Sequence, residues 1–368
     1  MKKVMLDQMI LTTCCPTNAG SKMLENFTAP FDATVVEKLR ERYEIACHAG
    51  KAPVGEFAID LVGESCFQGA ADTAKALKSD AVSALLTLDV NGAPRRIAAQ
   101  QGLVFIKPTY GIVSRFGTVP VACSGECVGV MAKSVADCRE VLSAIVGKDE
   151  RDGTMHADAV CTGALESAPV KKVAALKMDG ADSAEMTAAK TAFVANGIEV
   201  AEIDAGVIAT ASAAWNMLMC AELCNNVSRY DGMKYGYRTK NYKNLDELYT
   251  NSRTEAFGLF LKTAILYGSD VLSTKNYMAK YDKAMRVRRV ISEAFAAIFA
   301  EFDAVLLPAV SKMAYTEADS AFVENKYTAP AQMAGLPAVV AAGVQVMGPA
   351  FSDGKLLSLA ALLAKEGK

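Results

Sequence analysis

Ser65, Cys66 and Lys75 are residues whose types and spacing could support covalent catalysis. A serine or cysteine is a weak nucleophile at its ordinary pKa, and a nearby lysine can act as the base that activates it. The same residues also fit a structural role, in which Ser65 and Cys66 pack in the core and Lys75 is solvated. We expect the structural role and keep the three residues as a hypothetical replacement active site.

The cysteines and histidines do not form a metal-binding pattern. The ten cysteines are scattered, with Cys14 and Cys15 adjacent and without the paired CxxC motifs of a zinc site. His48 and His156 are the only histidines, which disfavours a histidine-rich metal site and a histidine-dependent triad. We therefore expect no metal and no cofactor, and we interpret the cysteines as small buried apolar residues in a reducing cytoplasm.

The stretch DVNGAPRRIAAQQGLVFIKPTYGIVS, at 89–114, must position any chemistry in this half of the chain. Leu103–Ile106 is a short apolar run with β-branched residues, and Lys-Pro and Tyr-Gly follow it, which predicts a buried strand. Asn91-Gly92 is a turn signal, because glycine readily adopts positive φ.

Several motifs resemble the amidase-signature family. KPTYGIVSRFG at 107–117 resembles its KPTYGRVSRYG signature. SKMLENFTAPFDATVVEKL at 21–39 and the RYDGMKYGYR segment that starts at 229 resemble one branch, the A subunit of glutamyl-tRNA(Gln)/aspartyl-tRNA(Asn) amidotransferase. The resemblance implies a single α/β domain over 1–368, with a mixed β-sheet sandwiched between helix layers. It also implies that the family's N-terminal segment and part of its glycine-serine loop are missing.

The resemblance places the family's catalytic triad on residues that cannot perform its chemistry. The family hydrolyses amides with a Ser–cis-Ser–Lys triad, and backbone N–H groups hold the oxyanion. The implied positions fall at Leu6 for the lysine, Gly69 for the bridging serine and Ala93 for the nucleophile. Pro94 also removes a backbone N–H from the adjoining turn. We expect no catalytic residue at these positions.

The groups that hold the glutamine donor in the family are also changed. Its aromatic residue falls at Trp215, its arginine at Ala264 and its aspartate at Asn325. Loss of the guanidinium removes the bidentate partner for an α-carboxylate. Asp89 and Arg95 match family positions, but a buried Asp–Arg pair near a turn is as easily structural as functional. We predict a residual pocket formed by Asp89, Gly92, Arg95, Trp215 and Asn325.

Composition and charge exclude some classes of function. Hydrophobic residues make up 52% of the 368 residues, charged residues 22%, and the net charge is −2. This is an ordinary soluble composition without the basic excess of an autonomous nucleic-acid binder. No apolar run reaches about 18 residues, and Asp7 and Gln8 interrupt the N-terminal apolar residues, so we expect no membrane helix and no signal peptide. We predict a cytoplasmic protein that does not contact a membrane.

Periodicity predicts the elements that flank these motifs. A helix is expected from Asp32, with the aspartate as its cap, and another over Ser134–Ile145, with Ser134 as its cap. Short connections predict a β-α-β unit with parallel strands. Its three elements are Val173–Met178, Ser183–Ala195 and Ile198–Ile203.

Three hypotheses for function remain open. The first is an inactive amidase-like protein that binds or scaffolds, with an amidotransferase B- or C-type subunit or an active A-type paralogue as its partner; self-association is compatible with it. The second is an active glutamine-dependent subunit of protein biosynthesis that another chain completes. The third is a protein that binds a small amide or amino acid in the residual pocket. We favour the first, because the triad atoms are missing.

Overall fold

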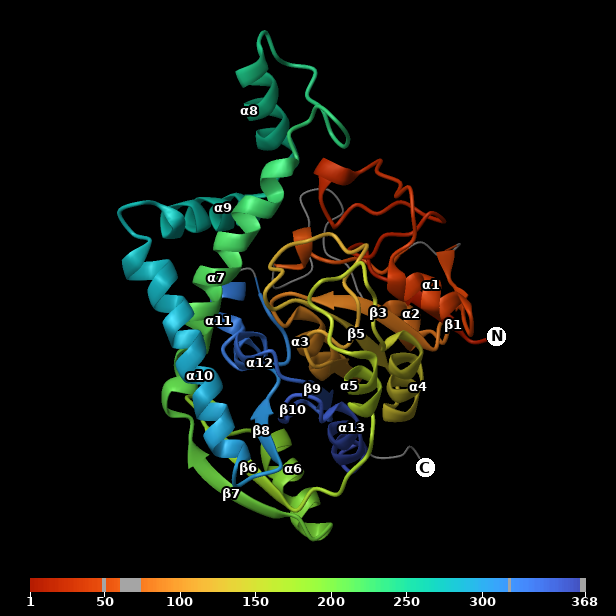
Figure 1. Cartoon of the computed structure of the whole chain (residues 1–368), viewed down its shortest axis with the longest axis vertical. Coiled ribbons are helices and arrows are strands. Elements are labelled where there is room, and N and C mark those ends of the chain that lie inside the picture. The colour runs from red at the N-terminus through yellow and green to blue at the C-terminus, as the bar shows by residue number, and fades with distance from the viewer. Residues whose placement is uncertain (48–50, 60–73, 317–318, 365–368) are drawn as a thin grey trace.

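The fold is built around a mixed sheet of ten strands, within a computed structural model that describes residues 1–47, 51–59, 74–316 and 319–364 (Figure 1). The strand order is β2-β1-β3-β5-β4-β9-β10-β8-β6-β7. The strands are β1 (Lys3–Leu6), β2 (Glu44–Ile45), β3 (Ala84–Asp89), β4 (Val104–Lys107), β5 (Cys127–Ala132), β6 (Lys172–Lys177), β7 (Glu199–Asp204), β8 (Ala304–Pro308), β9 (Ala338–Ala341) and β10 (Val344–Met347). Parallel pairs lie toward both edges, and the five pairings from β3 to β8 are antiparallel.

Helices cover both faces of this sheet. Successive residues of a strand point to opposite faces, and in β3 Leu86 joins one core cluster while Leu85 joins the other. The first cluster contains Leu142 of α4 (Val135–Ile145), and the second contains Ala98 of α3 (Ala93–Gln101). The predicted mixed sheet between helix layers is therefore confirmed.

A group of long helices packs beside the sheet. Helix α7 (Ala211–Asn226) contacts both α9 (Leu259–Leu272) and α10 (Lys283–Phe299), and α8 (Leu245–Ala256) extends away from the sheet at the top of Figure 1. The remaining helices are α1 (Thr34–Arg40), α2 (Lys75–Lys78), α5 (Asp158–Gly163), α6 (Ala184–Ala195), α11 (Ala321–Glu324), α12 (Ala329–Ala334) and α13 (Asp353–Ala361).

The predicted local elements are largely confirmed, with one wrong cap. Strands β6 and β7 are parallel and joined by α6, as the β-α-β pattern predicted. Ser134 caps α4, since its hydroxyl accepts a hydrogen bond from the Asp137 N–H. Asp32 does not cap α1: Ala33 is the cap residue, and the Asp32 carboxylate instead accepts hydrogen bonds from Thr12 and Thr13.

Strands β9 and β10 are joined by a two-residue turn. Ala341 pairs with Val344, which leaves Ala342 and Gly343 as the whole connection. Both have positive φ, at 50° and 82°. Two-residue hairpin turns with positive φ at both positions match the twist of the flanking strands, and alanine is a poor residue for the first position.

One helical stretch, Gly206–Arg229, is long and apolar enough to cross a membrane by length and composition. Such a stretch was not expected from the sequence. In this protein 56% of its most apolar window is buried, and α9, α10 and α12 contact α7 within it. A helix buried inside a protein has an apolar composition like that of a helix that crosses a membrane. The packing of this stretch against the other long helices therefore accounts for its hydropathy.

Candidate functional site

The position implied for the nucleophile lies at a strand-to-helix turn. Strand β3 ends at Asp89, and α3 begins at Ala93 with a proline in its first turn. Gly92 has the predicted positive φ, 78°, and its N–H donates to Asp89 Oδ1 at 2.8 Å. A Cβ atom at Gly92 would lie 2.1 Å from Thr328 Oγ1, so only glycine fits this position. The N–H of Gly92 is thus directed to a carboxylate inside the protein.

The position implied for the lysine is part of the apolar core. Leu6 is the last residue of β1, is 2% exposed and pairs with Leu86 of β3. The adjacent Asp7 is fully buried and accepts hydrogen bonds from the N–H groups of Met9 and Leu88, both at 2.8 Å. Burial raises the pKa of the Asp7 carboxyl, and these hydrogen bonds offset part of that effect. The structure thus has the buried carboxyl group of Asp7 at this point, and the position before it holds a leucine and no lysine.

The hypothetical replacement site is only partly described. Ser65, Cys66 and Gly69 lie outside the described residues. Lys75 begins α2 and is exposed, as the structural role predicted. Its exposure is that of a solvated lysine. Among the described residues, no hydrogen bond joins the Lys75 ammonium to a nucleophile.

Asp89 and Arg95 form a closed, fully buried network. Arg95 Nε donates to Asp89 Oδ2 at 2.8 Å, Nη1 donates to Gln345 Oε1 at 3.1 Å, and Nη2 donates to Gln332 Oε1. Gln332 Nε2 in turn donates to Asp89 Oδ1 at 2.9 Å. Burial lowers the pKa of the Arg95 guanidinium, and the Asp89 carboxylate offsets part of that effect. Each guanidinium nitrogen therefore already has an acceptor within the protein. These hydrogen bonds join β3, α3, α12 and β10.

Asn325 is the centre of a second buried network. Its Nδ2 donates to Asn91 Oδ1 at 2.7 Å and to Asn216 Oδ1 at 2.9 Å, and its Oδ1 accepts from Ser212 at 2.5 Å. Asn216 donates onward to the carbonyl of Phe322 at 2.7 Å. The neutral amide of Asn325, at the position that the resemblance implies for an aspartate, satisfies these groups without a buried charge. The network connects the turn after β3 to α7 and α11.

Trp215 is completely buried, and its indole Nε1 has no hydrogen-bond partner among the described residues. A Cβ atom at Gly125 would lie 2.4 Å from the Trp215 ring and 3.3 Å from the carbonyl of Gln332. Trp215 therefore lies near the Asp89–Arg95 network. Ala264, at the implied arginine position, is also fully buried. The structure thus brings the five predicted pocket residues into one buried region, where four of them mainly bond to other protein groups.

Arg96 is a site residue that was not predicted from the sequence. It is 1% exposed; its Nη1 donates to the Asn91 carbonyl at 2.6 Å and lies 3.4 Å from Thr328 Oγ1. In the part of the chain that the structure describes, Arg96 Nε and Nη2 and the buried Tyr315 hydroxyl have no hydrogen-bond partner. Burial lowers the pKa of this guanidinium, and interaction with Tyr315 offsets part of the effect. A signal was present in the sequence, since APRRIA places two adjacent arginines directly after the turn.

The cysteines depart in part from the prediction. Cys127, Cys138, Cys161 and Cys220 are buried, as expected. Three others are half-buried free thiols: Cys15, Cys123 and Cys224. The remaining described pair, Cys14 and Cys47, forms a disulfide, with Cys14 exposed and Cys47 half-buried. The interpretation of all cysteines as buried apolar residues is wrong for this pair, because the loops after β1 and β2 bring distant positions together.

Comparisons with known proteins identify the family. The Amidase family model matches residues 79–357, which is more than half of the chain. This chain belongs to the amidase family. It is 33% identical to the A subunit of the Chromohalobacter salexigens glutamyl-tRNA(Gln) amidotransferase, over 98% of this chain and 80% of that protein. The corresponding protein of Latilactobacillus sakei is 34% identical, over 94% and 78%.

A solved structure extends the similarity to three dimensions. The A subunit of the Thermotoga maritima glutamyl-tRNA(Gln) amidotransferase matches with a TM-score of 0.79 and 28% identity, over 100% of this chain and 83% of that one. The resemblance found in the sequence motifs is therefore confirmed. At the two described positions where the sequence resemblance places triad residues, the chain has an apolar core residue, Leu6, and an alanine, Ala93.

Proposed function

We propose that this amidase-family protein does not hydrolyse amides and serves as a binding or scaffolding subunit beside a tRNA-dependent amidotransferase. One observation carries the proposal: Ala93, at the position that the resemblance implies for the nucleophile, follows a turn whose Gly92 N–H is hydrogen-bonded to Asp89. A methyl group supplies no nucleophile, and Leu6 supplies no base. The protein as we envisage it is one cytoplasmic domain, and its partner is a B- or C-type subunit or an active A-type paralogue.

Exposed apolar side chains on α9 support a partner at this surface. Leu259 is 82% exposed and Leu266 is 72% exposed. Residues seven apart lie on the same face of a helix. Large exposed apolar side chains gathered on one face are typical of protein–protein contacts.

Two measurements test this proposal. The purified chain should release no ammonia from glutamine, alone or with candidate partner subunits, above the level of a Lys75→Ala variant. Ammonia release that Ser65→Ala or Lys75→Ala abolishes would show that the chain is catalytically active and would overturn the proposal. Affinity capture from the native host should recover an amidotransferase component, and the absence of one would also overturn the proposal.

A matched pair of variants tests the α9 surface. Leu266→Lys should abolish partner capture, because it places a charge in the apolar contact. Thr187→Lys adds the same charge at an exposed position of another helix, α6, and should leave capture unchanged. Both variants should melt as the wild type does, since both positions are exposed. Equal capture by all three proteins would exclude α9 as the contact.

Arg96 favours a second candidate function, the binding of a small carboxylate beside the former nucleophile. A buried guanidinium with two unpaired nitrogens is costly without an anionic partner, and an arginine fork matches a carboxylate. Amino acids and related carboxylates should therefore raise the melting temperature of the wild type. The same ligands should leave Arg96→Met unchanged. No shift across the series, or an equal shift in both proteins, would exclude this site.

A further inference from the structure

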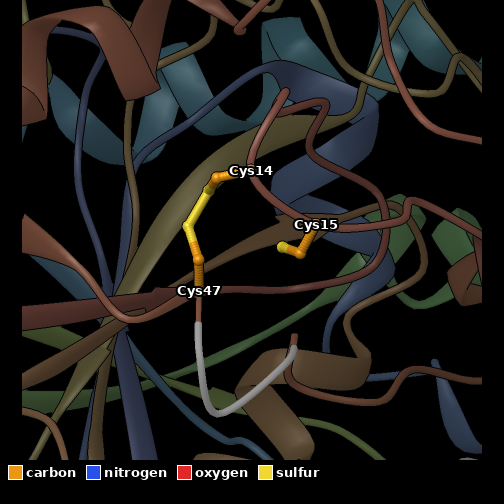
Figure 2. Close-up of side chains that lie close together, drawn as sticks. All are labelled: Cys14, Cys15 and Cys47. Carbon is orange, nitrogen blue, oxygen red and sulfur yellow. A yellow bond between two sulfur atoms is a disulfide. The ribbon is translucent and has the colours of Figure 1, made fainter.

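Three cysteine side chains from two separate loops meet at one edge of the sheet. Cys14 and Cys15 follow β1, and Cys47 follows β2. The Sγ atoms of the three residues all lie within 4.8 Å of one another. Figure 2 shows the Cys15 side chain pointing toward the disulfide between Cys14 and Cys47. Among the described residues this is the only group of three or more histidine, cysteine or acidic side chains so arranged.

The loops that carry these cysteines are held in place by other contacts. Strands β1 and β2 pair in parallel, and the Ala46 N–H donates to the Val4 carbonyl at 2.9 Å. In the first loop, the Thr13 N–H donates to Asp32 Oδ1 at 2.7 Å. Thr12 Oγ1 also donates to Asp32 and lies 3.2 Å from Cys14 Sγ. The arrangement of the three sulfur atoms therefore does not depend on the disulfide alone.

A half-buried lysine supplies positive charge beside the cluster. Lys51 Nζ donates to the Ile10 carbonyl at 2.5 Å and to Thr17 Oγ1. Burial lowers the pKa of Lys51 to about 8, and the nearby Cys15 offsets part of that effect. Three thiolates here would be balanced by one divalent cation together with the Lys51 ammonium.

We propose that the reduced chain binds one Zn²⁺ through the thiolates of Cys14, Cys15 and Cys47. Thiolate sulfur is a preferred ligand of zinc, and three protein ligands leave the fourth tetrahedral position open. A small dithiol first reduces the disulfide: it loses two electrons and two protons, becomes a cyclic disulfide, and leaves Cys14 and Cys47 as thiols. Zn²⁺ then displaces the protons of the three thiols. The disulfide and the metal site are mutually exclusive states of the same residues.

The spacing explains why the sequence did not indicate this site. Zinc motifs are recognised by short paired spacings, whereas here two ligands are adjacent and the third lies 33 residues beyond Cys14. The parallel pairing of β1 and β2 closes that distance. The zinc site uses none of the residues on which the proposed function rests, so the two proposals can be tested separately.

Cobalt titration of the full chain tests the site. The chain is reduced with a dithiol, desalted without oxygen and titrated with Co²⁺, whose absorption reports tetrahedral thiolate ligation; zinc competition then gives the affinity. One equivalent should bind, and Cys15→Ser should weaken binding at least about 100-fold, since even partners outside the ligand set contribute 10- to 100-fold. Cys123→Ser, which removes a half-buried thiol elsewhere, should bind as the wild type does.

Two further outcomes decide the proposal. Reoxidation should release the metal, and a dithiol should restore binding. Cys15→Ser retains both disulfide cysteines, so its oxidised form should have the same melting temperature as the oxidised wild type. It therefore provides a folded control. Wild-type affinity in Cys15→Ser, equal loss in Cys123→Ser, or no thiolate-to-cobalt absorption in the reduced chain would each overturn the proposal.

Discussion

Asp353 holds Thr109 with two hydrogen bonds inside the protein. The Thr109 N–H donates to Asp353 Oδ1 at 2.8 Å, and its hydroxyl donates to Oδ2 at 2.6 Å. Thr109 belongs to the KPTYG motif, and Asp353 is the first residue of α13. The signature motif is therefore connected directly to the C-terminal helix and is part of the framework of the fold.

The first prediction concerns pH. Burial raises the pKa of Asp353 from 3.8 to about 6, and the Thr109 hydrogen bonds offset part of the effect. The pKa of Asp353 is therefore higher in the folded state than in the unfolded state. Protonated Asp353 contributes its full amount to the free energy of unfolding below about pH 4, and this contribution is lost as the pH rises through about 6. The loss corresponds to roughly 3 kcal/mol.

Urea unfolding at pH 4 and pH 7 measures this effect. Asp353→Asn keeps an acceptor and a donor for Thr109 and removes the titration. The wild type should therefore lose more stability than Asp353→Asn between the two pH values. Equal losses in the two proteins would contradict the raised pKa, and the paired measurement cancels the titration of other buried acids such as Asp7 and Glu126.

The second prediction concerns the hairpin between β9 and β10. Ala342 is exposed and has a φ of 50°, which costs an L-residue with a Cβ atom roughly 1–2 kcal/mol. Ala342→Asn creates an Asn-Gly turn, the preferred pair for this geometry, and should stabilise the fold by about 1 kcal/mol in chemical unfolding. Gly343→Ala is the control and should destabilise, because its Cβ would lie 2.9 Å from Glu185 Cγ at a φ of 82°. Stabilisation by both changes, or by neither, would contradict this account.

The third prediction concerns Ala93, at the position implied for the nucleophile. Ala93→Ser restores a hydroxyl but no base, since Leu6 is a buried apolar residue. The variant should fold and release no more ammonia from glutamine than the wild type. A rise in ammonia release in Ala93→Ser would mean that another group activates the serine, and it would reject the interpretation of this turn as a former active site.

Local patterns predicted much of the fold because their physical causes are local. The Ser134 cap and the β-α-β unit from Lys172 to Asp204 follow from short-range hydrogen bonding and apolar periodicity, and both are confirmed. Asp32 failed as a cap because tertiary hydrogen bonds from Thr12 and Thr13 occupy its carboxylate. This competition depends on tertiary packing, so a short stretch of sequence does not indicate it.

The buried polar networks could be predicted only in part. Asp89 and Arg95 were expected to pair, and they do. Their partners Gln332 and Gln345 lie more than 230 residues further along the chain, so no sequence spacing indicates them. Cys14 and Cys47 were not expected to meet for the same reason.

The last prediction uses two adjacent arginines that differ only in their partners. Arg95 and Arg96 are both fully buried, but Arg95 is paired with Asp89, whereas Arg96 Nε and Nη2 lack partners within the described ranges of the chain. Arg95→Met leaves the Asp89 carboxylate buried without its counter-charge and should cost roughly 3–5 kcal/mol of unfolding free energy. Arg96→Met replaces an unpaired charge with an apolar side chain. The free energy of unfolding should therefore stay unchanged or rise by about 1–4 kcal/mol.

Chemical unfolding of both variants in the absence of ligand measures this contrast. Both substitutions remove the same atoms from neighbouring positions of α3, so differences in helix propensity cancel. If Arg96→Met is as destabilising as Arg95→Met, Arg96 already has a compensating partner in the free protein. A carboxylate ligand would then be unnecessary, and the second candidate function would fail. If only Arg95→Met is destabilising, the unpaired guanidinium of Arg96 is an unmet cost of the free fold, and an anionic ligand beside Ala93 is the group that would offset it.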